Sequence, residues 1–190
     1  MATQAAVKQN IVNGVDVDRL FATIDTIKES PSIAAFRFRA TNKWIDGGHN
    51  RTTVVDFYGA GEDHRHETAF ELDAGEPPVL LGLDEGPNPV EYFLTALAGC
   101  LTSSIAYHAA ARGIRIRGVE SRLEGDLDLR GFLGLSPDVK VGYENIRVYF
   151  KIDADISEEQ KEELIQLAQK YSPVFNSVAR PVAVEVKLDT

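Results

Sequence analysis

The alternation of apolar and polar residues along the first half of the chain predicts one helix followed by a meander of strands. Apolar positions at helical spacing predict a helix over residues 17–28, which Ser30-Pro31 would end. Alternating residues then predict strands over 36–40, 51–58 and 67–73, with Asp46-Gly47-Gly48 as a turn. Residues 1–15 are weakly patterned, and we expect them to be mobile.

The longest predicted helix begins at Asn88-Pro89, because proline is tolerated in the first turn, and runs to about Arg112. Gly113 supplies the stop signal. The helix sequence, VEYFLTALAGCLTSSIAYHAAAR, is apolar or small nearly all round. A helix of this kind is buried on most sides, either inside a domain or across a subunit interface.

The second half of the chain returns to alternating patterns. Strands are predicted over residues 123–129 and 146–153, and Ser157 with Gln160 predicts a capping box for a helix to about Tyr171. A final strand is predicted from the alternating residues Val182, Val184, Val186 and Leu188. The order of elements favours an α+β fold with an antiparallel sheet over a doubly wound fold. We expect an N-terminal arm over residues 1–32 and one α+β domain over residues 33–190.

Composition narrows the classes of partner. Apolar residues make up 44% of the 190 residues and charged residues 26%, as in globular proteins. The net charge of −9 repels phosphate backbones, so we expect no nucleic-acid partner. No apolar run comes close to the roughly 20 residues of a membrane span, and no secretory signal is visible, so we expect a cytoplasmic protein without membrane contact. The sequence contains no phosphate loop and no dinucleotide fingerprint, and we expect no cofactor.

The single cysteine, Cys100, lies in the middle of the long predicted helix. It cannot form an internal disulfide, and a reducing compartment keeps it as a thiol. In one interpretation Cys100 is a small buried hydrophobe. In the other it reacts as a thiolate, which a mid-helix position does not favour and which therefore requires a nearby cation. Arg51 has the strand parity of the apolar residues Val55 and Phe57 and is the candidate cation.

Two segments resemble the signatures of the OsmC/Ohr family, the osmotically inducible and organic hydroperoxide resistance proteins. They are GPNPVEYFLTALAGCLTSS, which resembles the central-helix signature, and SPVFNSVARPVAVEV, which resembles the second signature. The resemblance implies an intertwined homodimer in which a curved antiparallel sheet wraps around central helices. It also implies reduction of organic hydroperoxides by a helix cysteine that an arginine and a glutamate activate and a second cysteine resolves.

These family roles transfer to the present residues only in part. Cys100 matches the reactive cysteine, and Arg51 is the best match for the activating arginine. Val90 follows Asn-Pro where the family carries its glutamate, and Glu91 comes one residue late, which is a rotation of about 100° along a helix. Ser172, before Pro173, occupies the position of the second cysteine.

Histidines and an apolar loop complete the candidate residues. His49, His64 and His66 cluster around the predicted meander, and a metal site at His64 and His66 is the alternative to a solvated turn, which we favour. Phe132 and Leu133, with Leu135, lie in a loop that would ordinarily be polar, so we expect this loop to pack on something or to form an apolar wall.

Two functions remain open after the sequence analysis. The first is an enzyme that reduces organic hydroperoxides with Cys100 and is recycled by an external thiol. The second is a binder of a small apolar or lipid-like ligand in the dimer groove, with Cys100 only lining the site. The absence of the glutamate and of the second cysteine favours the binder more than in a standard family member.

Overall fold

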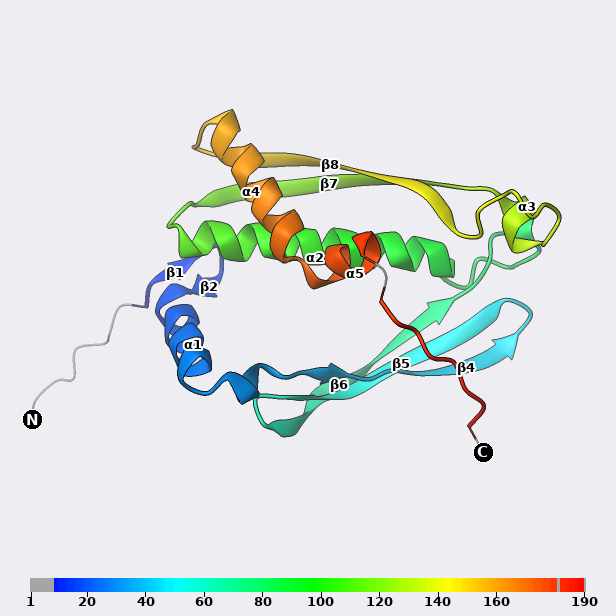
Figure 1. Ribbon diagram of the computed structural model, residues 1–190, viewed down its shortest axis with the longest axis horizontal. Helices are drawn as coiled ribbons and strands as arrows, with labels where there is room; N and C mark the ends of the chain where they lie inside the picture. Colours follow the sequence, from blue (N-terminus) through cyan, green and yellow to red (C-terminus); the bar gives the residue numbers. More distant parts are fainter. Residues whose placement is uncertain (1–8, 181, 190) are drawn as a thin grey trace, which may run out of the picture. The chain divides into compact units, whose positions relative to one another are not determined.

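The computed structural model describes residues 9–180 and 182–189. These residues belong to two compact units of the chain. Unit 1 contains Asp18–Phe93, and unit 2 contains Asn10–Val17 and Leu94–Thr190. All pairs of strands are antiparallel within the described residues, so the predicted α+β class with antiparallel sheets is confirmed (Figure 1).

Unit 1 contains a helix and a four-stranded sheet. Helix α1, Val17–Glu29, confirms the predicted helix, and the 3-10 turn η1, Pro31–Ala34, follows it. The sheet is built from β3 (Arg37–Phe38), β4 (Thr41–Asp46), β5 (His49–Gly59) and β6 (Glu62–Ala74). Strand β5 is central because it pairs with each of the other three. A second 3-10 turn, η2 (Pro78–Leu80), comes before the long helix.

The sheet of unit 1 differs from the predicted meander in two strands. Strand β4 was not predicted, because its residues lack a clear alternation. Strand β6 starts at Glu62, so the prediction that His64 lies in a solvated turn is wrong. Ala60 and Gly61 both adopt positive φ and form a two-residue hairpin turn, which lets the strand begin directly after them.

Unit 2 is organised around helix α2, Pro89–Ala111, whose predicted length and end at Gly113 are confirmed. The hairpin of β7 (Ile116–Leu127) and β8 (Tyr143–Ala154) runs along this helix (Figure 1). Helices α4 (Glu158–Tyr171) and α5 (Pro173–Ala179) follow, and the predicted capping box of Ser157 with Gln160 is present. The buried core joins these elements through Leu97, Leu101, Ile105, Ile152, Ala154 and Ala168.

Helix α2 corrects one expectation from the sequence. By length and composition it is apolar enough to cross a membrane, with a mean hydropathy of 1.2 over an 18-residue window. Thr, Ser and His residues interrupt the apolar run of this helix, although its mean hydropathy is high. The core helix of a soluble domain meets the same criterion, and Ile105 and Ala109 of α2 are fully buried.

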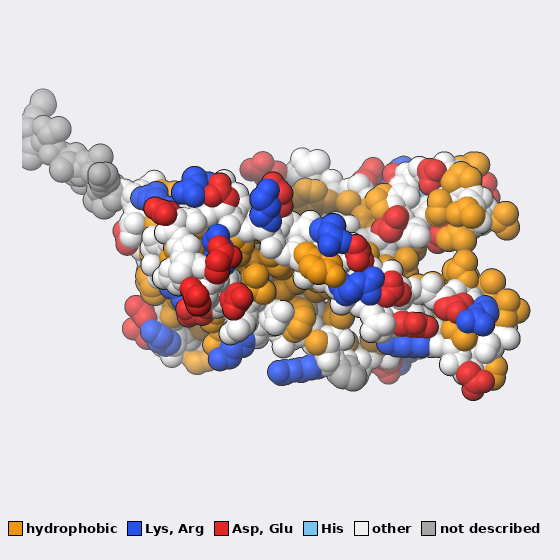
Figure 2. All heavy atoms as spheres, turned by 90° about the horizontal axis from the view of Figure 1, so that it is seen from above, with side chains coloured by type: hydrophobic (Ala, Val, Ile, Leu, Met, Phe, Trp, Pro, Cys, Tyr) orange, Lys and Arg blue, Asp and Glu red, His pale blue; other side chains and the backbone are white. Residues whose placement is uncertain are grey.

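Two apolar segments of unit 2 are exposed. The loop that contains α3, Leu129–Phe132, leaves Phe132 75% and Leu133 59% exposed. Figure 2 shows apolar side chains on the viewed face around the loop that carries α3. The predicted final strand is not formed within residues 182–189, because none of the described strands pairs with it, and its apolar side chains are exposed.

The segment before α1 is ordered where it is described, contrary to the expected mobility, while residues 1–8 lie outside the described part of the chain. Strands β1 (Ile11–Val12) and β2 (Val15–Asp16) form a hairpin whose turn residues, Asn13 and Gly14, have positive φ. The Asn13 amide donates to the Ile114 carbonyl and accepts from the Ile116 N–H, both at 2.9 Å. The hairpin is thereby tied to the start of β7.

We predict that Asn13→Ala lowers the free energy of unfolding by about 2 kcal/mol, since it removes two partly buried hydrogen bonds and places alanine at positive φ. Urea denaturation measures the change. Asn13→Asp keeps the acceptor for Ile116 and is expected to lose about half as much. Equal stability of Asn13→Ala and the unaltered protein would contradict this anchoring role.

Candidate active site

The structure brings Cys100 and Ser172 into direct contact, although 72 residues separate them in the sequence. Cys100 lies on α2 and is partly buried, while Ser172 lies between α4 and α5 and is fully buried. The Ser172 hydroxyl donates to the Cys100 sulfur across 3.0 Å between Oγ and Sγ. The two positions that the family resemblance assigned to a pair of cysteines are therefore neighbours in space.

Ser172 is fixed in place because it serves both helices at their junction. Its N–H donates to the Ala168 carbonyl at 2.8 Å at the end of α4. Its Oγ accepts from the Phe175 N–H at 3.2 Å and so caps the start of α5. The Asn176 side chain donates to three carbonyls of the same corner, those of Gln169, Lys170 and Ser172.

Other polar side chains near Cys100 on α2 are occupied elsewhere. The Ser104 hydroxyl donates to the Cys100 carbonyl oxygen at 2.9 Å, not to its sulfur. The His108 ring packs on the Tyr171 ring with centroids 5.2 Å apart. Burial, followed by the positive charge of Arg112, lowers the pKa of His108 below its usual value, so this histidine is neutral at pH 7.

Glu91 caps helix α2. Its carboxylate accepts from the Asn88 N–H at 2.9 Å, and the Asn88 side chain accepts from the Glu91 N–H at the same distance. This reciprocal pair is a capping box, which stabilises the first turn of the helix. The spacing of Asn88 and Glu91, an N-cap residue with Glu three positions later, is the sequence signal for this cap.

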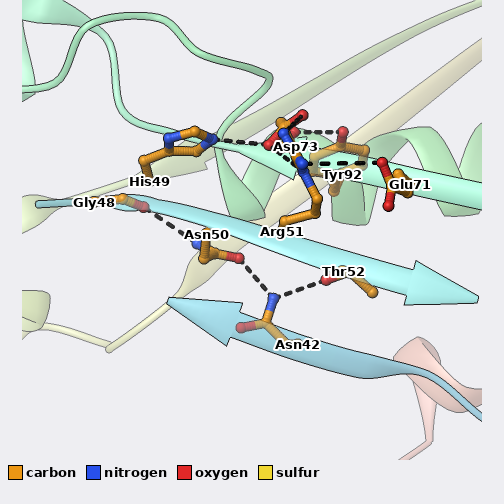
Figure 3. Close-up of polar contacts among 9 residues, drawn as sticks. All are labelled: Asn42, Gly48, His49, Asn50, Arg51, Thr52, Glu71, Asp73 and Tyr92. Atoms are coloured by element: carbon orange, nitrogen blue, oxygen red, sulfur yellow. Dashed lines mark hydrogen bonds and ion pairs between the residues drawn. The ribbon is translucent and has the colours of Figure 1, made fainter. Parts of the chain in front are cut away.

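Arg51 lies in a charged cluster of unit 1 with His49, the other predicted site residue of β5 (Figure 3). Its guanidinium donates to both carboxylate oxygens of Asp73, at 3.0 and 3.1 Å, and lies 3.9 Å from the Glu71 carboxylate. His49 Nε2 lies 2.8 Å from the same Asp73 carboxylate. Asp73 therefore joins the two predicted residues, although the sequence analysis did not single it out.

The hydrogen bonds of Arg51 and then of His49 lower the pKa of Asp73 below its usual value, and the same ion pair raises the pKa of Arg51. The Tyr92 hydroxyl also donates to the Asp73 carbonyl at 2.7 Å. Strand pairing explains the cluster, because Lys43, Arg51 and Asp73 are direct cross-strand partners. The side chains around Arg51 are therefore charged, not apolar as its parity with Val55 and Phe57 predicted. The pairing of β5 with β6 is irregular between Val54 and Asp56, so the alternation does not continue unbroken along β5.

A shallow pocket of about 490 Å³ adjoins this cluster and is lined by Lys43, Trp44, Ile45, Arg51, Thr53 and Glu71. Arg51 belongs to unit 1 and Cys100 to unit 2, so the predicted action of Arg51 on the thiol stays a prediction.

The contacts of His64 are with the protein itself. Its Nε2 lies 2.9 Å from the Gly59 carbonyl oxygen, and its ring stacks on the ring of Phe57. Across residues 9–180 and 182–189, no group of three or more His, Cys, Asp or Glu could hold a metal ion.

Comparison with known proteins gives a family and a fold. A family model described as "OsmC-like protein" matches residues 82–187. This range contains Cys100, Phe132, Leu133 and Ser172, whereas His49 and Arg51 precede it. A search of curated proteins found no match.

Solved structures of similar fold come from several bacteria. An OsmC-like protein from Mycoplasma pneumoniae has 19% identity and a TM-score of 0.58, over 76% of this chain and 89% of that one. A putative osmotic stress induced and detoxification response protein from Psychrobacter arcticus 273-4 has 13% identity and a TM-score of 0.54, over 73% and 85%. An organic hydroperoxide resistance protein OsmC from Legionella pneumophila has 19% identity and a TM-score of 0.53, over 75% and 90%. At these identities the likeness supports the fold alone.

We predict that Asp73→Asn destabilises the protein near neutral pH, and that the difference from the unaltered protein begins to shrink as the pH falls below about 4 and disappears once the pH is below the folded pKa of Asp73. The pKa of Asp73 is lower in the folded state, so its ionised form stabilises the fold above the ordinary carboxyl range, and this contribution is lost as the pH falls through the folded pKa. Urea denaturation at several pH values measures it. Glu67→Gln, which alters an exposed carboxylate of the same strand, is the control, and a parallel pH dependence in both variants would refute the prediction.

We predict that Ser172→Cys creates an internal disulfide with Cys100 after treatment with a hydroperoxide. The present Oγ–Sγ distance of 3.0 Å leaves about 1 Å of approach to a disulfide bond length. Intact mass should show a loss of two hydrogens in the variant, whereas the unaltered protein without reductant should gain two or three oxygens on Cys100. Ser172→Cys combined with Cys100→Ser is the control. Free thiols in the oxidised single variant would show that the two positions are not a redox pair.

Proposed function

Because the chain belongs to the OsmC-like protein family, we propose that it reduces organic hydroperoxides and uses Cys100 as the reactive thiol. The contact between the Ser172 hydroxyl and the Cys100 sulfur is the observation that supports this most directly. A cysteine that served only as a small hydrophobe would need no buried polar neighbour, and burying a hydroxyl beside apolar residues is unfavourable unless it is hydrogen-bonded.

The proposed reaction begins with the thiolate of Cys100. The sulfur attacks one oxygen of the hydroperoxide, the O–O bond breaks, and the departing alkoxide takes up a proton and leaves as an alcohol. The sulfur loses two electrons to the peroxide and becomes a sulfenic acid. An external thiol then condenses with the sulfenic acid, releasing water and forming a mixed disulfide, and a second external thiol releases Cys100 by exchange.

The reductant has to come from outside the chain, because the sequence contains one cysteine. Ser172 cannot replace the second thiol, since its hydroxyl oxygen forms no stable covalent link to sulfur under these conditions. Arg51 remains the candidate cation for the thiolate on the strength of the resemblance. Asp73 and Glu71 offset part of its charge within unit 1, so its effect on a thiol would depend on how far the guanidinium leaves these partners.

A binder of a small apolar or lipid-like ligand is the second candidate function. It is supported by the exposed apolar loop, which includes Phe132, Leu133 and Leu135. Exposed apolar groups of this size commonly mark interaction surfaces. In that case Cys100 would line the site, and the protein would bind a fatty acid without consuming a hydroperoxide.

We also propose that the protein is a cytoplasmic homodimer. The OsmC-like fold is a soluble domain, and the members of the family are generally dimeric. The apolar side chains of residues 182–188 and of the loop after α3 are exposed in the single chain, which supports a partner surface supplied by a second copy.

We predict that the purified protein consumes cumene hydroperoxide and fatty-acid hydroperoxides when a dithiol is supplied, and that Cys100→Ser abolishes this activity. Peroxide loss measured against time, with several thiol donors, is the assay. Retained activity in Cys100→Ser, or no activity of the unaltered protein with any donor, would leave the ligand-binding function as the better proposal. A fluorescent fatty acid displaced by competitors would then report binding.

Alkylation of Cys100 tests the role of Arg51. Arg51→Ala is expected to lower the rate of Cys100 alkylation at neutral pH by about tenfold or more, because an arginine beside a thiol favours its charged form. Arg39→Ala, which removes another ion-paired arginine of unit 1, is the matched control. Equal alkylation rates for both variants would make Arg51 a structural residue of its ion cluster.

We predict a particle of twice the chain mass of 20.9 kDa by light scattering at micromolar concentration. An intertwined interface should bury more than about 2,000 Å² and should survive dilution. Replacing Val184 and Val186 together by Thr tests the contribution of the C-terminal segment, with Lys187→Ala as the control in the same segment. A stable monomer of the unaltered protein would overturn the proposal.

A further inference from the structure

Two contacts use the hydrogen and one of the two lone pairs of the Ser172 hydroxyl. A serine hydroxyl donates one hydrogen and accepts through two lone pairs. Oγ accepts from the Phe175 N–H at 3.2 Å and donates to the Cys100 sulfur at 3.0 Å. Ser172 has an exposed fraction of 0%, so bulk water does not compete for this hydrogen.

The protonation state of Cys100 decides how well this arrangement is satisfied. A neutral thiol sulfur is a weak acceptor, so the buried hydroxyl then makes a poor hydrogen bond. A thiolate is a charged acceptor, and hydrogen bonds to charged groups are stronger than those between neutral groups. In general, a hydrogen bond donated to the charged form of a group favours that form.

We propose that the Ser172 hydroxyl is a dedicated hydrogen-bond donor to the reacting sulfur, which stabilises the Cys100 thiolate and then the sulfenate that forms from it. This inference rests on the proposed peroxide reduction and adds a residue to it. The serine occupies the position of a resolving thiol, but it takes part through a hydrogen bond in place of a covalent bond. The oxidised sulfur is thereby held for an external thiol.

The donor is held rigidly before any reaction takes place. Ser172 joins α4 to α5 through its N–H and Oγ, and Asn176 fixes the surrounding carbonyls. A hydroxyl that is fixed by such neighbours does not have to reorganise when negative charge develops on the sulfur. The same rigidity makes Asn176 useful as a control, because its side chain supports the corner without touching the sulfur.

The pH dependence of Cys100 alkylation by iodoacetamide tests the proposal. Ser172→Val and Ser172→Thr have nearly the same shape, but only the threonine retains a hydroxyl. We expect Ser172→Val to move the midpoint of the pH–rate profile upward by about one unit, a fall of about tenfold in reactivity at neutral pH. Ser172→Thr should keep the midpoint of the unaltered protein. Asn176→Ala, which keeps the Ser172 hydroxyl, should lower the melting temperature and move the midpoint much less than Ser172→Val.

Peroxide treatment tests the second half of the proposal. Trapping with dimedone should capture sulfenic acid in the unaltered protein and in Ser172→Thr, and several-fold less in Ser172→Val at equal extents of thiol oxidation. If Ser172→Val does not fold, Ser172→Ala, which adds no volume, takes its place in both measurements. An unchanged midpoint in the folded hydroxyl-free variant, or a shift of the same size in Asn176→Ala, would overturn the proposal.

The two proposals fail in different ways. A hydroxyl-dependent midpoint in a protein that consumes no hydroperoxide would support the role of Ser172 and reject the enzymatic function. Cys100-dependent peroxide consumption, with a midpoint of the pH–rate profile that is the same with and without the hydroxyl, would support the enzymatic function and reject the role of Ser172. The alkylation profile uses no hydroperoxide and no reductant, so it does not depend on finding the natural substrate.

Discussion

Helix α2 is apolar around almost its whole circumference, and the need to cover it organises unit 2. The β7–β8 hairpin and the α4–α5 corner both pack against it, through Leu97, Leu101 and Ile105 on the helix side. The same covering positions Ser172 against Cys100, because the corner between α4 and α5 meets the helix at the level of the cysteine. The contact at the sulfur is therefore a consequence of how the long helix is buried.

The elements that depend on local signals were predictable from the sequence. Helix α2 follows from Asn88-Pro89, its apolar run and Gly113, and the start of α4 follows from the capping box of Ser157 with Gln160. The final strand was not predictable in the same way. Alternation in residues 182–188 shows that the segment suits a strand, but a strand also requires a partner, and the described strands offer none.

Among the candidate residues too, what depends on local sequence was predictable and what depends on distant partners was not. The family resemblance found Cys100 and Ser172 by position, while their contact depends on packing between segments far apart in the sequence. Arg51 was found by parity, but its neighbours depend on the register that pairs it with Lys43 and Asp73, and a period of two does not reveal that register. The role of Glu91 follows from local spacing, because a Glu three residues after Asn88 predicts the cap that the structure contains.

Under the proposed function, a hydroxyl at the position where the resembled signature carries a thiol would change which reactions the site can complete. A hydroxyl is smaller than a thiol, donates a stronger hydrogen bond and caps α5 through the same oxygen. It cannot close a disulfide, so each oxidised cysteine would wait for a thiol from solution. Access of that thiol to the partly buried sulfur would then govern the fate of Cys100, because nothing within the chain competes with it. Under the proposed function, turnover would therefore be coupled to the supply of external thiol, whereas a two-cysteine site can store the oxidation in its own disulfide.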